Sequence, residues 1–291
     1  MIDIVSEIFP VLICPDDGSN LLLENNKLIC TDCKRNFVID KNIIDLRPKE
    51  NLNIDDLNVV KIYKTYYKNL VTYGSGGEKI GTFGISSNSI SRGFVKDVLS
   101  LIGKHISRNM FICDIGAGSG DYSVELSKKC KFMLHCDLDL NGIKIAQETA
   151  KKHKIDNIVF LYFNYFKLPL KNKMIDLIYS IDILERGIKH EKKILQEIER
   201  ISKSHCKILV DFHSKERKRL THSENESLCT YSKNEIKDLI SGFQFEINSI
   251  TGTGFIPQLI KYSNTQYKIL NPLARLLSFP PARWLVLFFK N

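Results

Sequence analysis

The sequence predicts an α/β protein in which a doubly wound domain follows a small N-terminal β module. From residue 91 onward, short apolar segments alternate with amphipathic segments of helical period, which is the pattern of strands and helices in a doubly wound domain. Before residue 48, short extended pieces are separated by polar turns, and three of the eight cysteines lie there. A length of 291 residues is enough for one large domain with an appendage.

Each element follows from its local pattern. The strands are apolar without alternation, as a parallel sheet covered on both faces requires. Ser232 and Glu235 form a capping-box signature that opens a helix ending near Gly242. We expect helices over about 91–107, 121–130, 140–153, 191–203 and 232–240, and strands over about 110–115, 132–137, 158–163, 175–180, 208–212, 243–250 and 284–289. The predicted domains are therefore 1–48 for the β module, 49–90 for a linker helix (55–70) with a mobile Gly/Ser loop, and 91–291 for the α/β domain.

The charge is unevenly distributed. The net charge of +9 divides into −3 for residues 1–50 and +12 for the rest, and residues 111–213 carry only +3 of that. A basic chain favours an anionic partner such as nucleic acid, an anionic membrane surface or a phosphorylated small molecule. A generally lysine-rich composition explains the excess equally well.

The N-terminus predicts a cytoplasmic protein. Asp3 and Glu7 stand where a signal peptide needs basic residues. No apolar run approaches the ~18–20 residues that span a bilayer. The scattered cysteines are interpreted as small buried hydrophobes, as in a reducing compartment.

A glycine-rich loop is the strongest site signal. Gly116, Gly118 and Gly120 follow a predicted strand that ends at Asp114, and a predicted helix comes next. Such a loop allows a ligand to approach the backbone, and the helix N-terminus adds N–H donors. A dinucleotide fingerprint needs a third glycine where Asp121 stands, so a ligand without a pyrophosphate fits better. Asp114 can receive a cationic amine of that ligand.

An acidic residue ends the next predicted strand. Asp137 lies 21 residues after Gly116, at the position where a carboxylate accepts hydrogen bonds from ribose hydroxyls. Asp139 is then the N-cap of the following helix. The reverse assignment, with Asp139 on the ribose and Asp137 as the cap, stays open.

Residues 114–213 resemble the class I S-adenosylmethionine-dependent methyltransferases of the type 11-like group. The resemblance rests on DIGAGSGDYSVEL, on HCDLDLNGIKIAQETAKKH and on FNYFKLPLKNKMIDLIYSIDILER, which are similar to four successive family motifs in order. It implies a Rossmann-like, seven-stranded sheet and S-adenosyl-L-methionine as the cofactor. Asn164 stands where the family usually has Asp, and Arg186 where many members have His. The cofactor-binding residues implied by the resemblance are Asp114, Gly116, Ala117, Gly118, Gly120, Asp137, Leu138, Asn164 and Asp182.

Methyl transfer to an oxygen or nitrogen needs a nucleophile aligned with the donor and a base to remove its proton. His213 directly follows the fifth predicted strand and is the preferred base, with Glu185 and His190 as further candidates. A polar residue on a surface loop is the alternative interpretation of each.

The cysteines of the β module have the spacing of two metal-binding knuckles. Cys14 and Asp17 form the first pair, and Cys30 and Cys33 form the second. The segment is similar to zinc-ribbon-like modules that precede some methyltransferase domains, including an rRNA guanine methyltransferase group. It implies a Zn2+ site in which Asp17 replaces the fourth thiolate. A degenerate ribbon that folds on its β core alone is the alternative.

Three functions are compatible with the sequence. The first is methyl transfer to an anionic small-molecule or lipid/glycan-linked acceptor, because residues 270–284 are apolar and aromatic with interspersed arginines. That segment also suggests peripheral membrane contact. The second is RNA methylation, favoured by the charge and by Lys215–Arg219 but not by the sequence after the fourth strand, which lacks the N/D-P-P-Y/F/W tetrad. The third is a non-catalytic partner subunit, which the intact glycine loop disfavours.

Overall fold

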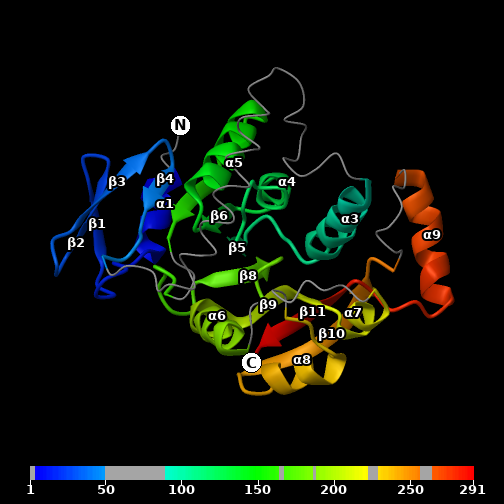
Figure 1. The fold of residues 1–291 in the computed structure, drawn as a ribbon. Helices are drawn as coiled ribbons and strands as arrows, with labels where there is room; N and C mark the ends of the chain where they lie inside the picture. Colours follow the sequence, from blue (N-terminus) through cyan, green and yellow to red (C-terminus); the bar gives the residue numbers. More distant parts are fainter. Residues whose placement is uncertain (1–3, 50–88, 164–166, 186–187, 222–228, 256–263) are drawn as a thin grey trace. The chain divides into compact units, whose positions relative to one another are not determined.

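The computed structural model describes residues 4–49, 89–163, 167–185, 188–221, 229–255 and 264–291 (Figure 1). The chain divides into two compact units, one formed by residues 1–84 and 107–175 and the other by residues 85–106 and 176–291. The predicted linker helix at 55–70 and nearly all of the Gly/Ser loop fall outside the described residues, so both stay predictions.

The first unit begins with a small β module. Its strands are joined by two-residue turns at Asn25–Asn26 and Lys41–Asn42, and all four of these residues have positive φ values between 47° and 69°. Positive φ at both central residues is what a type I′ hairpin turn requires. The elements are α1 (Ile4–Ile8), η1 (Phe9–Val11), β1 (Leu21–Glu24), β2 (Lys27–Cys30), β3 (Asn36–Asp40) and β4 (Ile43–Asp45).

The module continues directly into the sheet of the first unit. β4 pairs in parallel with β7 (Ile158–Tyr162), so that Ile44 lies opposite Leu161. Parallel pairing then runs from β7 to β6 (Phe132–Asp137) and from β6 to β5 (Phe111–Ile115). The helices α4 (Ser123–Ser127) and α5 (Leu140–Lys152) connect these strands. Apart from the half-buried Phe111, Asp137 and Tyr162, every residue of β5, β6 and β7 is buried, which confirms the interpretation of continuously apolar segments as parallel strands.

The second unit has a sheet with the strand order β8-β9-β11-β10. β11 lies between β9 and β10 and is antiparallel to both. The elements of this unit are α3 (Ser89–Gly103), β8 (Ile175–Ser180), α6 (Ile188–Ile201), β9 (Ser202–His213), α7 (Lys215–Thr221), α8 (Lys233–Ile240), β10 (Phe245–Thr253), α9 (Asn264–Leu276) and β11 (Arg283–Lys290).

Most predicted elements are present, and the α/β class is confirmed. The capping box is confirmed as well, because the Ser232 hydroxyl accepts the Glu235 N–H and the Glu235 carboxylate accepts the Ser232 N–H. One boundary was wrong. The helix predicted to reach residue 203 ends at Ile201, and β9 begins at Ser202 rather than at 208. Antiparallel pairing with β11 accounts for this extension only as far as Lys207, which lies opposite Phe289. The helices α1, α7 and α9 and the 3-10 helix η1 were not predicted.

Among the described residues, no helix combines the length and the apolar character needed to cross a bilayer.

Gly120 is a tightly packed glycine position and gives a direct test of the packing. Its φ is +85°, and a Cβ there would lie 2.7 Å from the Cβ of Ala146 in α5. We expect Gly120→Ala to lower the free energy of unfolding by about 2–4 kcal/mol, through overpacking and left-handed strain together. Urea unfolding measures the change. Gly242→Ala is the control, because its Cβ would make only an ordinary 3.6 Å contact. Equal losses for the two variants would contradict the described packing.

Candidate cofactor site, active site and metal centre

The glycine loop is held in a conformation that side chains disfavour. Gly116, Gly118 and Gly120 have φ values of 76°, 54° and 85°, in the left-handed region where glycine is the default residue. The N–H groups of Gly116 and Ala117 both donate to the carbonyl of Cys136 on β6, at 2.8 and 3.1 Å. The loop is therefore fixed to the end of the neighbouring strand.

Asp137 lies at that strand end and holds two backbone segments. Its Oδ2 accepts the N–H of Gly118 and its Oδ1 accepts the N–H of Asp139, each at 2.7 Å. Burial raises the pKa of Asp137 to about 6, although the two backbone N–H groups oppose the shift. A carboxylate offers about four lone-pair positions. With two used by the backbone, about two remain for the hydroxyls of a ribose.

Asp139 caps a helix instead of binding the glycine loop. Its Oδ1 accepts the N–H groups of Asn141 and Gly142, at 2.8 and 3.1 Å, which makes it the N-cap of α5. This geometry favours Asp137 over Asp139 as the ribose ligand. Asp114 and Leu138 are buried near the ends of β5 and β6. Asn164 lies outside the described residues.

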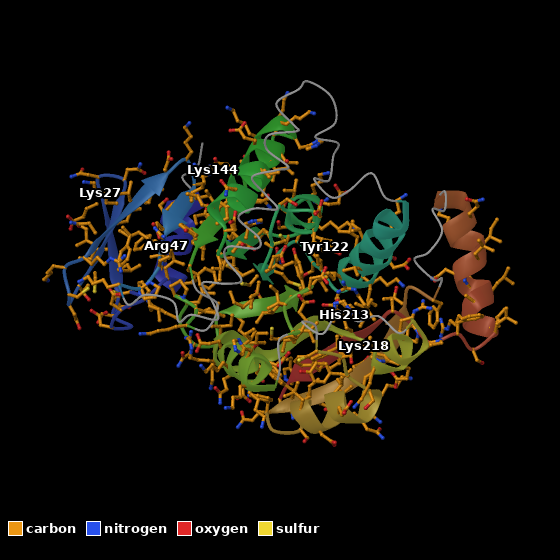
Figure 2. The ribbon with its side chains drawn as sticks, viewed as in Figure 1. Lys27, Arg47, Tyr122, Lys144, His213 and Lys218 are labelled. Atoms are coloured by element: carbon orange, nitrogen blue, oxygen red, sulfur yellow. The ribbon has the colours of Figure 1, made fainter. Side chains whose placement is uncertain are left out.

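The second unit brings together two candidate catalytic residues. His213 ends β9 and is labelled in Figure 2. Its Nε2 lies 2.9 Å from Oε2 of Glu185, whose side chain is 11% exposed against 22% for His213. A carboxylate at Nε2 favours the tautomer with its proton on that nitrogen, and Nδ1 is then the basic atom of the ring. His190, the third candidate, lies in α6.

The sequence alone did not indicate Arg283 and Asp211, which lie beside this pair. The guanidinium of Arg283 contacts the carboxylates of both Asp211 and Asp182. Asp211 also accepts the N–H of Asp182 at 2.8 Å, and burial raises the pKa of Asp211 despite the opposing charge of Arg283. Asp182 has a positive φ of 64°, and His213 Nε2 lies 4.0 Å from its Oδ1. A charged residue within the apolar strand ILVDFH was the available signal, because a buried carboxylate needs a partner.

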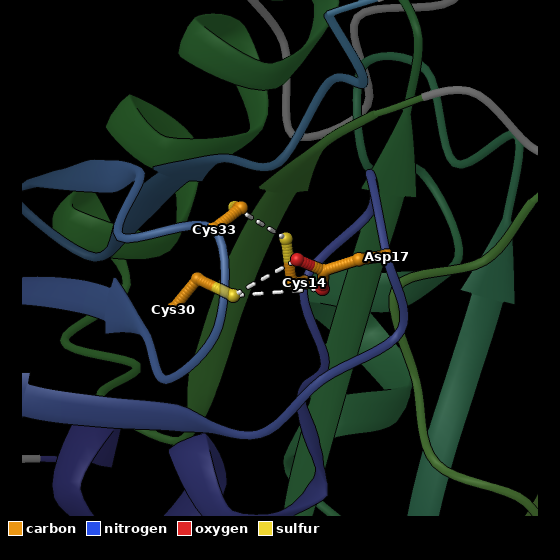
Figure 3. Close-up of side chains that lie close together, drawn as sticks. All are labelled: Cys14, Asp17, Cys30 and Cys33. Atoms are coloured by element: carbon orange, nitrogen blue, oxygen red, sulfur yellow. Dashed lines mark hydrogen bonds between the residues drawn. The ribbon is translucent and has the colours of Figure 1, made fainter.

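The four predicted metal ligands of the β module lie together (Figure 3). Cys14 Sγ lies 3.7 Å from Cys33 Sγ, and Cys30 Sγ lies 3.4 Å from a carboxylate oxygen of Asp17. All four ligand atoms lie within 4.8 Å of one another. Two thiolates of a tetrahedral zinc site are about 3.8 Å apart, given Zn–S bonds of about 2.3 Å. The spacing and the chemistry of the donor set therefore fit zinc.

Three of these groups, Cys14, Asp17 and Cys33, have shifted pKa values, and that of Cys33 is raised. Burial raises the pKa of Cys14 to about 12. The N–H of Ser19 holds the pKa of Asp17 well below its usual range. Asp17 is consequently an ionised ligand at neutral pH, whereas the Cys14 thiol must release a proton to bind a metal ion.

Several known proteins are similar to this chain in sequence or in fold. The release factor glutamine methyltransferase of Dictyoglomus turgidum is 34% identical over 67 residues, which are 22% of this chain and 24% of that protein. The chain thus aligns with about a quarter of this curated relative. Magnesium protoporphyrin IX methyltransferase from Synechocystis PCC 6803 has the same fold, with a TM-score of 0.57 and 12% identity over 81% of this chain and 100% of that one.

A second solved structure also shares the fold. Geranyl diphosphate C-methyltransferase from Streptomyces coelicolor A3(2) matches with a TM-score of 0.51 and 12% identity, over 67% of this chain and 76% of that one. The family model described as a methyltransferase domain matches residues 106–269, more than half of the chain. This match shows that the protein belongs to the methyltransferase domain family, among the class I S-adenosylmethionine-dependent methyltransferases.

Proposed function

We propose that the protein transfers a methyl group from S-adenosylmethionine to an oxygen or nitrogen atom of a small-molecule or lipid/glycan-linked acceptor. The observation that carries this proposal is the hydrogen bond of 2.9 Å between His213 and Glu185. A histidine oriented by a carboxylate is a general-base arrangement, which an O- or N-acceptor needs. The second candidate is RNA methylation, which the basic Lys215–Arg219 segment favours.

The cofactor fits the first unit through its donor set. We assign the ribose to Asp137, the methionine part to Gly116, Ala117, Gly118 and Gly120, and the adenine to Leu138 with Asn164. Asp114, in the same unit, is assigned to the amino-acid end, whereas Asp182 lies in the second unit and stays an expectation from the sequence. The positive φ values of the glycines and the remaining acceptor capacity of Asp137 support this assignment.

The chain's own residues have a limited task in the reaction. Bound S-adenosylmethionine supplies a methyl group that is already activated on a sulfonium. His213 takes the proton of the acceptor hydroxyl or amine at Nδ1, while Glu185 holds Nε2–H and stabilises the imidazolium that forms. Arg283 contacts the carboxylates of Asp182 and Asp211 and so fixes the positions of these two side chains beside His213.

The acceptor class and the base are tested together. Protein is incubated with S-adenosylmethionine labelled in its methyl group and with separated lipid, small-molecule and RNA fractions of a cell extract. We expect label in the lipid or small-molecule fraction, and we expect His213→Ala to lower that transfer by roughly 10²–10⁴-fold with unchanged cofactor affinity. His153→Ala, an exposed histidine at the end of α5, should behave as wild type.

Two results would contradict this proposal. Label in RNA, with loss of transfer at high salt, favours the second candidate. Full activity in His213→Ala removes the base from the mechanism.

Cofactor binding should depend on pH through Asp137. Its raised pKa of about 6 means that the carboxylate becomes protonated as the pH falls through that value, and a protonated carboxyl accepts ribose hydroxyls less well. We expect the dissociation constant for S-adenosylmethionine to rise by up to about tenfold per pH unit below about pH 6. Isothermal titration calorimetry measures it.

Asp137→Asn removes the charge and should weaken binding by roughly 10–100-fold at pH 7.5, with little remaining pH dependence. Asp156→Asn changes an exposed aspartate of the same unit and is the matched control. An unaltered pH profile in Asp137→Asn would remove Asp137 from the ribose site.

We also propose that Cys14, Asp17, Cys30 and Cys33 bind Zn2+. The metal would join the loop after η1 to the loop after β2 and so stabilise the β module. Purified protein should release about one zinc ion per chain on treatment with a thiol-reactive reagent, and chelation should lower the melting temperature.

Substitutions of the proposed ligands should change zinc retention in opposite directions. Cys33→Ser should lose zinc, whereas Asp17→Cys should hold it more tightly, because structural zinc sites favour thiolates over a carboxylate. Cys229→Ser, far along the chain and outside the cluster, should retain zinc. Zinc content that is indifferent to both Cys33→Ser and Asp17→Cys would exclude this site.

A further inference from the structure

The second unit contains a cavity on the opposite side of β11 from the candidate catalytic cluster. It has a volume of about 520 Å³, and its lining includes Lys233, Phe255, Arg275, Phe279 and Trp284. Successive residues of a strand face opposite sides of a sheet. The side chain of Arg283 contacts Asp211 and Asp182, so that of Trp284 faces the other side. The cavity is therefore a site separate from His213 and Glu185.

The lining combines aromatic surfaces with two cations. Lys233 Nζ lies 4.6 Å from the centroid of the Trp284 ring, and Arg275 Cζ lies 6.0 Å from that of Phe255. Glu216 is the acidic residue of the lining, and its Oε2 accepts the Ser214 hydroxyl at 3.0 Å and the Trp284 indole N–H at 3.3 Å. Within the described part of the chain, neither Lys233 nor Arg275 forms an ion pair. This combination suits an amphiphile with an anionic head.

An exposed apolar surface borders the cavity. Ile269, Leu273 and Leu276 follow the i, i+4, i+7 spacing of one helix face on α9, and Leu277 and Phe279 continue it. Their exposed fractions range from 42% for Phe279 to 79% for Leu276. These five are most of the seven large hydrophobic side chains exposed in the described residues. Phe279 belongs both to this surface and to the cavity lining. α9, in orange in Figure 1, packs against α3 within the same unit.

The charged residues of α9 are all basic. Lys268 and Arg275, both exposed, lie on α9 beside the apolar stripe. A second copy of the chain docked by the same face would bring like charges together. An apolar helix face flanked by cations instead fits the interface of a bilayer that contains anionic lipids.

We propose that α9 and the segment through Phe279 dock on an anionic membrane, with the cavity receiving the phosphate of a lipid headgroup between Lys233 and Arg275. Ile269, Leu273, Leu276 and Leu277 enter the boundary between headgroups and acyl chains. The inference deepens the lipid-linked branch of the proposed acceptor and rests on the proposed function to that extent. Docking itself needs neither cofactor nor methyl transfer.

Co-sedimentation of the full chain with vesicles tests the proposal. Wild-type protein should bind vesicles of phosphatidylcholine mixed with phosphatidylglycerol more tightly than vesicles of phosphatidylcholine alone, and high salt should reduce the difference. The double variant Leu276→Glu/Leu277→Glu should bind at least about tenfold more weakly. Leu22→Glu/Val38→Glu places the same two charges at exposed apolar residues of β1 and β3 and should bind nearly as wild type.

A second variant isolates the headgroup contact. Lys233→Gln/Arg275→Gln should lose the preference for phosphatidylglycerol by roughly 30-fold, because each of the two basic residues near the surface contributes about 1 kcal/mol. Thermal unfolding checks that the variant is folded. Absence of wild-type binding to anionic vesicles overturns the proposal. A dimer in solution that Leu276→Glu/Leu277→Glu dissociates also overturns it, because the surface is then an interface between copies.

Failure of docking is distinguishable from failure of the proposed function. Calorimetry with S-adenosylmethionine and labelled methyl transfer to soluble fractions report on the first unit and on His213 without any membrane. A protein that binds cofactor but no vesicles refutes only the docking surface.

Discussion

The carboxylate of Asp137 is the contact on which the rest of the candidate cofactor site depends. It joins the N–H of Gly118, in the loop after β5, to the N–H of Asp139, in the loop after β6, with two bonds of 2.7 Å. Asp139 in turn caps α5, and Ala146 of α5 packs against Gly120 of the first loop. The loop after β5 and the loop after β6 are thus connected both through Asp137 and through α5, so neither loop can move without disturbing the other. A ligand that arrives there meets groups already in position, and little conformational entropy remains to be lost.

The parts of the structure that follow from local patterns were predictable. Continuous apolar runs located the strands of the first unit, and Asp139 and Ser232 were identified as caps because their residue types and spacing suit that geometry. The position of Asp137 at the end of a buried strand also followed. Strand positions follow from the regular period of apolar residues, and helix caps follow from the hydrogen-bonding groups of residues close in sequence.

Other parts depend on pairings between distant segments. Arg283 meets Asp211 across 72 positions of sequence because β11 inserts between β9 and β10. The pairing of Lys207 on β9 with Phe289 has the same origin, and it extends β9 one residue before its predicted start. The contact between Glu185 and His213 spans 28 residues and forms only through the path of the chain after β8. No periodicity within either segment encodes these contacts.

The pairing of β4 with β7 gives the N-terminal module a role that does not depend on a metal ion. Without β4, the backbone N–H and C=O groups along one side of β7 would form a bare sheet edge, which is a template for pairing with the strands of other molecules. With β4 in place, the sheet continues through β3 into the short strands of the module, which are joined by hairpin turns with positive φ values. The segment therefore protects the domain against aggregation through its edge.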